Sequence, residues 1–373
     1  MNPLRTTAAL FAAALLSLAL SGCGAGTVQS TSGNSGSQGS GGSSSASAYT
    51  GAIFSGKVLA GTQPIANAAV QLYAAGTTGN GSTATALIST ILSTDAKGAF
   101  TTPAYQCPSA TSLVYLIARG GNAGTGSGNS SIALAAPIGA CNSITTSSQF
   151  VINEETTVAA AWALAPFIAA GGNIGATSTN TQGLTNAFAT AASLADPSAG
   201  TSPGPTFPAN GKSPAARINT LANLLNACAV SATGNGCTQL FAATTVGSAT
   251  PSNTLDAAIN LVHNPATNVA TLFRLASASS AYQPVLANAP SDWTLSVTYS
   301  GAGMNEPTGI SIDSTGNVWV ASYFGVVSEF SPIGKPIFAN GITGSGLQSS
   351  YGLAIDSQNN IWVPNEDSPS GIN

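Results

Sequence analysis

The spacing of apolar and polar residues changes twice along the chain and divides most of it into three regions. Between residues 49 and 152, short segments of alternating apolar residues, such as 68–73, are separated by turn-forming residues, which predicts β-strands. Between residues 153 and 290, apolar residues recur at helical spacing. From residue 291 to 373 the alternation returns. The pattern predicts a multidomain α+β protein with a small antiparallel β-sandwich at 49–152, an Ala-rich helical domain at 153–290 and further strands at 291–373.

The helical region carries start and stop signals for five helices. Asn153 is a candidate N-cap, and Glu154 and Glu155 follow it at the positive end of the helix dipole. Ser213 is expected to cap the third helix, and the fifth is expected to start at residue 264. The residues expected to face inward include Val158, Ala161, Trp162, Leu184, Phe188, Ile218, Leu221, Leu225, Leu255, Ile259, Leu272 and Phe273.

A segment near the C-terminus occurs twice, with a constant offset of 43 residues. Such a period matches a β-propeller blade, which takes about 40–50 residues. Strands are expected at 308–313, 317–322, 326–331, 351–356 and 360–363, with the aspartates in hairpin turns and the tryptophans at equivalent places. The residues that define the repeat are Gly309, Asp313, Asn317 and Trp319 in the first copy and Gly352, Asp356, Asn360 and Trp362 in the second.

Two repeats do not close a propeller, which needs at least about four blades. A further strand is expected near residues 293–299. Because an unfinished sheet leaves open strand edges, we expect residues 291–373 to be an incomplete propeller of about two blades in a sequence truncated relative to its natural product. A short β-meander packed on the helices is the alternative.

The N-terminus has the layout of a secretory signal. Arg5 precedes an uncharged segment at 6–20, which is too short to span a bilayer, and the motif Leu20-Ser21-Gly22-Cys23 follows. This motif resembles the lipobox of bacterial lipoproteins. The resemblance implies removal of residues 1–22, lipidation of Cys23 and, since Gly24 is not acidic, an outer-membrane location. Residues 23–48 then form the lipid anchor and a Gly/Ser tether. An ordinary signal peptide with an incidental Cys is the alternative.

The first strand region contains Gly56-Lys57-Val58, Pro64-Ile65, Ala69-Val70 and Asp95-x-x-Gly98-x-Phe100. These motifs resemble those of the carboxypeptidase-regulatory-like family of β-sandwiches. It implies a structural module and not a peptidase. The chain departs from the family in long small-residue loops near residues 77–85 and 120–128.

The repeats resemble NHL-repeat and streptogramin-lyase-type propellers. Pro307-Thr308-Gly309-Ile310 matches the opening of such a blade, and Asp313 begins its Asp-x-x-Gly-Asn turn. Ser322 stands where that family has an Asp, and no Arg precedes Val326-Val327. The resemblance therefore supports a propeller fold and gives little support for an enzymatic activity.

Five cysteines remain compatible with an exported protein. If Cys23 carries lipid, four are left for disulfides, which persist outside the cytoplasm. Three pairings are open, and the local one is favoured, Cys107 with Cys141 and Cys228 with Cys237. A zinc site is the disfavoured alternative, because the chain has no Cys-x-x-Cys and a single histidine.

Other composition and motifs exclude more functions than they suggest. Charged residues make up 5% of the chain, the net charge is −4, and no basic cluster predicts a nucleic-acid partner. Gly211-Lys212-Ser213 lacks the spacing of a phosphate-binding loop and is interpreted as a helix entry. A Ser-His-Asp triad with His263 is not expected, because the chain has no Gly-x-Ser-x-Gly nucleophile elbow. The hairpin aspartates are expected to form turns and not a calcium site. Glu154 and Glu155 are poor candidates for a paired acid and base, since adjacent helical residues point in different directions. No cofactor or metal is expected.

Two function classes remain. The favoured one is a membrane-tethered binding or scaffold protein, whose propeller recognises a protein or carbohydrate ligand. The other is a propeller enzyme resembling streptogramin-type lyases or lactonases, whose active groups would come from further blades. No catalytic residue is named for either class.

Overall fold

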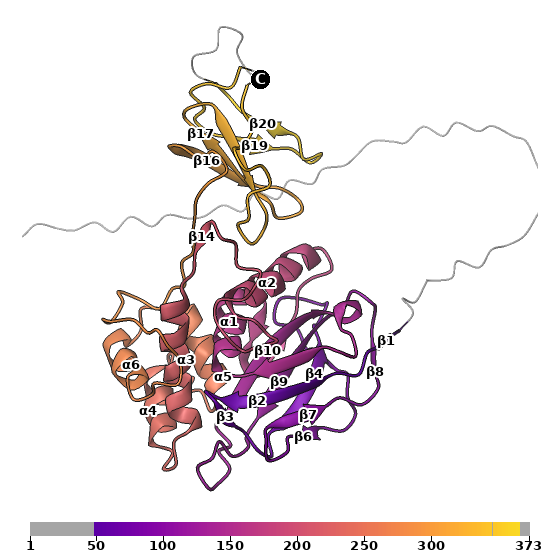
Figure 1. Ribbon diagram of the computed structural model, residues 1–373, viewed down its shortest axis with the longest axis vertical. Helices are drawn as coiled ribbons and strands as arrows, with labels where there is room; N and C mark the ends of the chain where they lie inside the picture. The colour runs from indigo at the N-terminus through magenta and orange to yellow at the C-terminus, as the bar shows by residue number, and fades with distance from the viewer. Residues whose placement is uncertain (1–47, 345, 366–373) are drawn as a thin grey trace, which may run out of the picture. The chain divides into compact units, whose positions relative to one another are not determined.

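The computed structural model describes residues 48–344 and 346–365 and shows a mixed α+β protein with six α-helices in that part and several small sheets (Figure 1). The predicted signal segment, Cys23 and the tether up to residue 47 lie outside the described residues. None of the helices within them has the length and apolar character that a membrane span requires.

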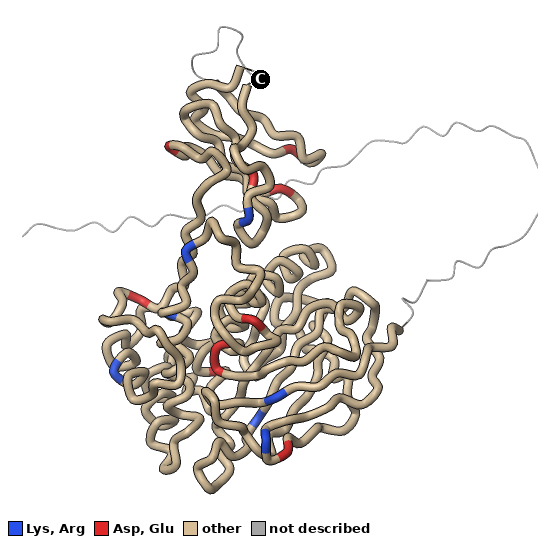
Figure 2. Tube along the Cα trace, viewed as in Figure 1, with Lys and Arg blue, Asp and Glu red and all other residues tan. Residues whose placement is uncertain are grey.

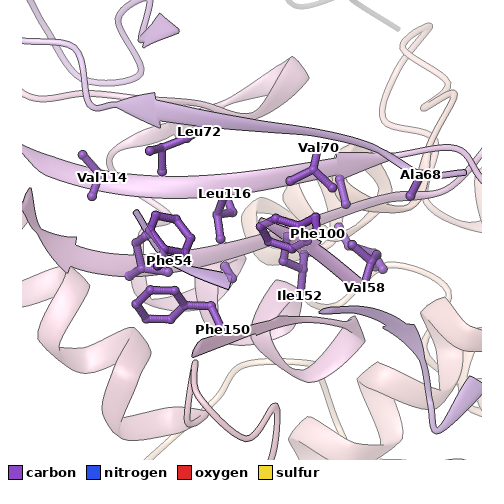
Figure 3. Close-up of a cluster of buried hydrophobic side chains, with 14 of the residues drawn as sticks. Phe54, Val58, Ala68, Val70, Leu72, Phe100, Val114, Leu116, Phe150 and Ile152 are labelled. Carbon is purple, nitrogen blue, oxygen red and sulfur yellow. The ribbon is translucent and has the colours of Figure 1, made fainter. Parts of the chain in front are cut away.

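Two sheets pack face to face in the first strand region. One contains β2 (Ser55–Ala60), β3 (Gln63–Pro64), β7 (Ala99–Thr101) and β11 (Gln149–Ile152), and the other contains β4 (Ala69–Ala74), β5 (Thr85–Ala86), β6 (Leu92–Ser93), β9 (Leu113–Arg119) and β10 (Ala133–Ala140). β1 (Tyr49–Gly51) pairs with β8 (Tyr105–Cys107). Alternate residues of β2 and β4 are buried, as the period of two predicts. Their inward side chains form one core with those of the other strands (Figure 3).

The second of these sheets is buried on both faces. Tyr115 and Ile117 of β9 and Ala133 and Ala135 of β10 point away from the first core and into a second one, built with α1 (Glu154–Ala163), α2 (Thr181–Leu194) and α5 (Thr254–His263). The sheet is therefore the middle layer of three. Residue 153, the expected domain boundary, marks a change from strand to helix, and the buried core continues across it.

Threonines of the helices cover the free edge of β10. The N–H of Ala133 donates to Thr254 Oγ1 at 2.9 Å, and the N–H of Ala135 donates to Thr157 Oγ1 at 2.9 Å. An uncovered edge would offer these groups to another strand. The two hydroxyls satisfy them instead and fix α1 and α5 to the sheet.

The helix starts differ in part from those expected. Asn153 caps α1, accepting from the Thr156 N–H at 3.0 Å, and this prediction is confirmed. The Ser213 prediction is wrong, because α3 (Ala215–Ala229) begins after Pro214 and the buried Ser213 hydroxyl has no partner. The last helix, α6 (Val269–Ala276), begins after Asn268, since residues 264–267 form a turn. α4 (Asn235–Ala243) was not expected; it follows the loop between Cys228 and Cys237.

A row of asparagines on α3 holds the segment at residues 279–286. Asn223 donates to the Tyr282 carbonyl oxygen at 2.9 Å and accepts from the Tyr282 N–H at 3.0 Å. Asn219 donates to the Pro284 carbonyl oxygen at 2.9 Å, and Asn226 accepts from the Ser279 hydroxyl at 2.8 Å. The three lie on one face of α3, so a single helix fixes this segment.

The remaining elements lead to the repeats. β12 (Ile168–Ala169) pairs with β13 (Asn173–Ile174), and two 3-10 turns lie at Cys141–Ser143 and Ala170–Gly172. β14 (Gly211–Lys212) pairs with β15 (Thr298–Tyr299), so the Gly211-Lys212 motif is a strand and not a helix entry. Of the strand expected at 293–299, only its end forms, because Trp293 is buried in the core of α1, α3 and α6.

β16 (Pro307–Ile312), β17 (Val318–Ser322) and β18 (Val326–Phe330) form one sheet, and β19 (Ala354–Ile355) pairs with β20 (Ile361–Trp362).

Candidate functional site

The residues predicted for disulfides come together in the local pairs. Cys107 and Cys141 are bonded at 2.07 Å, and Cys228 and Cys237 at 2.06 Å. The first bond joins β8 to the end of β10, and the second ties the end of α3 to α4. Both act within the fold.

Both turns that follow the first strand of each repeat have the same hydrogen-bond network. Asp313 accepts from the Thr315 and Asn317 N–H groups through Oδ1 and from Asn317 Nδ2 and Trp319 Nε1 through Oδ2. Asp356 accepts from the Gln358 and Asn360 N–H groups, Asn360 Nδ2 and Trp362 Nε1 in the same arrangement. The distances from Trp Nε1 to Asp Oδ2 are 3.1 Å in both. Each aspartate thus closes a hairpin and orients the tryptophan of the next strand.

These hydrogen bonds keep the two aspartates ionised. Partial burial raises the pKa of Asp313, but the donors from Thr315, Trp319 and Asn317 outweigh it and bring that pKa to about 2. The pKa of Asp356 is also about 2, chiefly because Asn360 donates to the carboxylate. The Asp313 carboxylate has five donors, the fifth being the Thr315 hydroxyl, and the Asp356 carboxylate has four. Within the described residues, no group of three or more His, Cys, Asp or Glu is placed to hold a metal ion.

The repeat extends further than the sequence motif. The strand register is conserved, since Trp319 pairs with Ser311 and Trp362 pairs with Ala354. Backbone angles repeat as well: φ is positive at Gly301, Gly303 and Glu306, and again 43 residues later at Gly344, Gly346 and Ser349. The signal that reveals this earlier start is the Gly-x-Gly that begins both segments. The segment at 336–342 adds a fourth member to the sheet of the first repeat, because Ile342 bridges Val327 of β18 and Pro336 bridges Phe330 of β18.

The two repeats contact each other through their first strands. Thr308 Oγ1 donates to the Ser350 carbonyl oxygen at 2.6 Å, and Ser311 Oγ donates to that of Leu353 at 3.2 Å. A Cβ on Gly309 would lie 2.5 Å from the Cα of Gly352, so the strands approach closely only because glycine stands there.

An aromatic cluster lies at the end of the repeats opposite the aspartate turns. Tyr323 contacts Phe324 and Tyr351 edge to face, with ring centroids 5.4 and 5.6 Å apart. Phe324 is 59% exposed and Tyr351 is 58% exposed. Tyr323 and Phe324 form the turn between β17 and β18, and Tyr351 precedes β19. The cluster was not predicted from the sequence, although Tyr323-Phe324-Gly325 places two aromatic residues in a turn, where a purely structural turn has no need of them.

The remaining chemical groups are committed to internal contacts. His263 Nδ1 lies 2.9 Å from the Ile259 carbonyl oxygen and Nε2 lies 3.0 Å from the Ala165 carbonyl oxygen. Charged residues are few and scattered (Figure 2). A cavity of about 140 Å³ between Trp162, Phe207 and Tyr299 has no charged side chain in its wall. It is smaller than the ~300–1,000 Å³ of ordinary small-molecule sites, whereas two hollows, one of about 510 Å³ lined by β8 and one of about 520 Å³ lined by β2, β7 and β11, fall within that range.

Glu154 and Glu155 are buried at the start of α1. Glu154 accepts hydrogen bonds from the Gly61 N–H at 3.0 Å, from Asn226 Nδ2 at 2.9 Å and from the Tyr282 hydroxyl. Burial raises the pKa of Glu154 against these three donors. Burial also raises the pKa of Glu155 to about 8, opposed by a hydrogen bond with the Ser202 backbone. The pair joins four segments of the fold and has no route to a substrate.

No protein-family model, curated protein or solved structure matches the chain.

Proposed function

We propose that this protein is a cell-envelope lipoprotein, held at the outer membrane through Cys23, that binds a protein or carbohydrate through its C-terminal repeats. The exposed aromatic cluster of Tyr323, Phe324 and Tyr351 carries the proposal. Tyrosine and phenylalanine supply large contact areas with little conformational entropy to lose, and such residues dominate binding surfaces. The aspartate turns and the short strands hold them on a fixed support.

The finer fold assignment belongs to the same proposal. Residues 49–152 are a carboxypeptidase-regulatory-like β-sandwich, supported by the two sheets that pack face to face. Residues 291–373 are part of an NHL-like β-propeller, supported by the 43-residue repeat of strand register, turn contacts and backbone angles. The helices between them, packed on the sandwich, serve as a support for the repeats.

The binding interpretation is favoured over catalysis by how the polar groups of the repeats are used. The aspartates that define the repeat have their oxygens occupied by five donors at Asp313 and four at Asp356, and Ser311 and Thr308 join the two repeats. The cluster of Tyr323, Phe324 and Tyr351 adds exposed aromatic surface, which suits contact with a partner.

Site-specific photocrosslinking in living cells tests the binding surface. A photoreactive phenylalanine analogue at position 324 should give a discrete adduct, and Tyr323→Ala in the same chain should weaken it at least severalfold. The control is the same analogue at position 338, which replaces another exposed phenylalanine of the repeats outside the cluster. Equal adducts at 324 and 338 would show that the cluster is not a binding surface.

Membrane fractionation tests the anchor separately. Cys23→Ser removes the residue that the lipobox would lipidate, so the variant should move from the membrane fraction to the soluble fraction. Ser21→Thr, a small change beside the same Cys, should stay with the membranes. A Cys23→Ser variant that sediments with membranes as before disproves lipid anchoring and leaves the aromatic cluster to its own test.

A further inference from the structure

The cavity of about 140 Å³ lies where α1 and α2 meet the segment at 295–299, which leads to the first repeat. Trp162, Phe207 and Tyr299 line it together with leucine, valine and isoleucine side chains. None of the described residues that form its wall is charged. Such a wall favours a small, uncharged and largely apolar ligand.

The aromatic rings of the wall are held in place by their neighbours. Trp162 Nε1 donates to the Trp293 carbonyl oxygen at 2.9 Å. The rings of Phe207 and Tyr299 are stacked, with centroids 6.5 Å apart. A Cβ on Gly334 would lie 2.2 Å from the Tyr299 ring, so the glycine leaves room for that ring. The wall is therefore formed before a ligand arrives, as is usual for small-molecule sites.

One polar group in the wall lacks a partner. Ser193 of α2 is 3% exposed, and its hydroxyl makes no hydrogen bond with any described residue. Unlike the unpaired Ser213 hydroxyl, it is not sealed among protein atoms. Because Ser193 lines the cavity, the cavity is the space that this hydroxyl reaches. The neighbouring Thr190 hydroxyl is already used, since it donates to the Asn186 carbonyl oxygen at 2.9 Å.

We propose that the cavity binds a phenol, a single aromatic ring with one hydroxyl group, whose ring contacts the apolar wall and whose hydroxyl bonds to Ser193 Oγ. The size fits one ring, because an engineered cavity of about 150 Å³ with apolar walls binds benzene. Aromatic walls favour an aromatic ligand, since rings attract each other beyond their buried area. The hydroxyl of the ligand removes the cost of an unpaired buried Ser193. The proposal does not depend on the ligand of the repeats.

Isothermal titration calorimetry with phenol tests the proposal on the full chain carrying Cys23→Ser, which removes the proposed lipid. Phenol should bind at one site with a saturable heat. Ser193→Ala should weaken phenol binding about fivefold, because one hydrogen bond between neutral groups is lost. The same variant should bind toluene, which has the ring and no hydroxyl, as the parent chain does. Phenol binding that Ser193→Ala leaves unchanged overturns the role given to this hydroxyl.

Filling the cavity identifies the site. Ala163 lines it at the end of α1, so Ala163→Leu should abolish the binding of both phenol and toluene. Ile333→Phe fills the same space from the turn after β18 and decides the matter if Ala163→Leu does not fold. The matched control is Ala189→Leu on the exposed face of α2, which should bind as the parent chain does. A saturable phenol signal that persists in a folded filling variant overturns the proposal, as does a parent chain that does not bind phenol.

Discussion

The buried carboxyl of Glu155 makes the stability of the fold depend on pH, and replacing it with glutamine should reduce that dependence. Glu155 is 4% exposed at the second residue of α1. Burial raises its pKa from 4.5 to about 8. A raised pKa in the folded state means that the protonated form favours folding, so the contribution is complete below about pH 4.5 and is lost as the pH rises through about 8.

The size of the effect follows from the shift. Each pKa unit corresponds to about 1.4 kcal/mol, so the shift lowers the free energy of unfolding, relative to its value well below pH 4.5, by about 5 kcal/mol above pH 8 and by about 3 kcal/mol at pH 7. Glu155→Gln is neutral at every pH and keeps an oxygen that accepts from the Ser202 backbone. Between pH 4.5 and 7, the free energy of unfolding of the variant should therefore rise by about 3 kcal/mol relative to that of the parent chain. Glu154 keeps its own part of the pH dependence, because burial raises its pKa against three donors.

Urea unfolding at pH 5, 7 and 9, followed by tryptophan fluorescence, measures this difference. Trp162 and Trp293 lie in or against the core that α1 helps to form and report on its unfolding. Glu306→Gln is the matched control, because Glu306 is exposed and its replacement should leave the pH profile unchanged. Parallel pH profiles for Glu155→Gln and the parent chain would refute the argument that Glu155 is buried in the neutral form.

Three further results are expected. Asp313→Asn should destabilise the first repeat by about 1–3 kcal/mol at pH 7, since the new amide nitrogen faces two hydrogen-bond donors. Because the pKa of Asp313 is lowered to about 2, the parent repeat should lose this stability advantage over the variant as the pH falls below about 4. Trp319 fluorescence measures both effects. Asn223→Ala should cost about 2–4 kcal/mol in urea unfolding, as it leaves the buried backbone of Tyr282 unpaired, whereas Gln182→Ala on an exposed face of α2 should cost under about 0.5 kcal/mol. Replacing both cysteines of a pair by serine should cost about 4 kcal/mol for Cys107 and Cys141 and about 3 kcal/mol for Cys228 and Cys237, because the longer loop loses more entropy on closure, and equal melting temperatures for the two variants would contradict that order.

The strands of the repeats lie close to their predicted places because the signal is local. Asp313, Asn317 and Trp319 form their contacts within six residues of one another, so the sequence contains the whole motif. The earlier start of the repeat at Gly301 was visible only as Gly-x-Gly, which without backbone angles is a common loop pattern. α4 was not predicted from the sequence.

The three-layer arrangement was harder to predict because it depends on long-range packing. The continuous apolar segment at 113–118 indicated a buried strand, and burial on both faces is what such a segment means. What covers the second face could not be known from the segment itself. The same holds for Glu154 and Glu155, which local rules place at a helix N-terminus as exposed partners of the dipole. The packing of α1 against α3 and the segment at 279–286 buries them instead.

In this fold, hydrogen bonds from neutral polar side chains hold segments together, a role that ion pairs have in more charged proteins. Amides of α3 fix one segment, and threonine hydroxyls cover the edge of β10. Across the described residues the only ion pair joins Arg217 to Asp292 at 3.8 Å, and both side chains are partly exposed. Salt screens exposed charges and leaves neutral hydrogen bonds nearly unchanged. The buried carboxyls, in contrast, respond to protons alone. The stability of the protein should therefore follow pH closely and ionic strength hardly at all, which sets it apart from folds that depend on networks of surface charges.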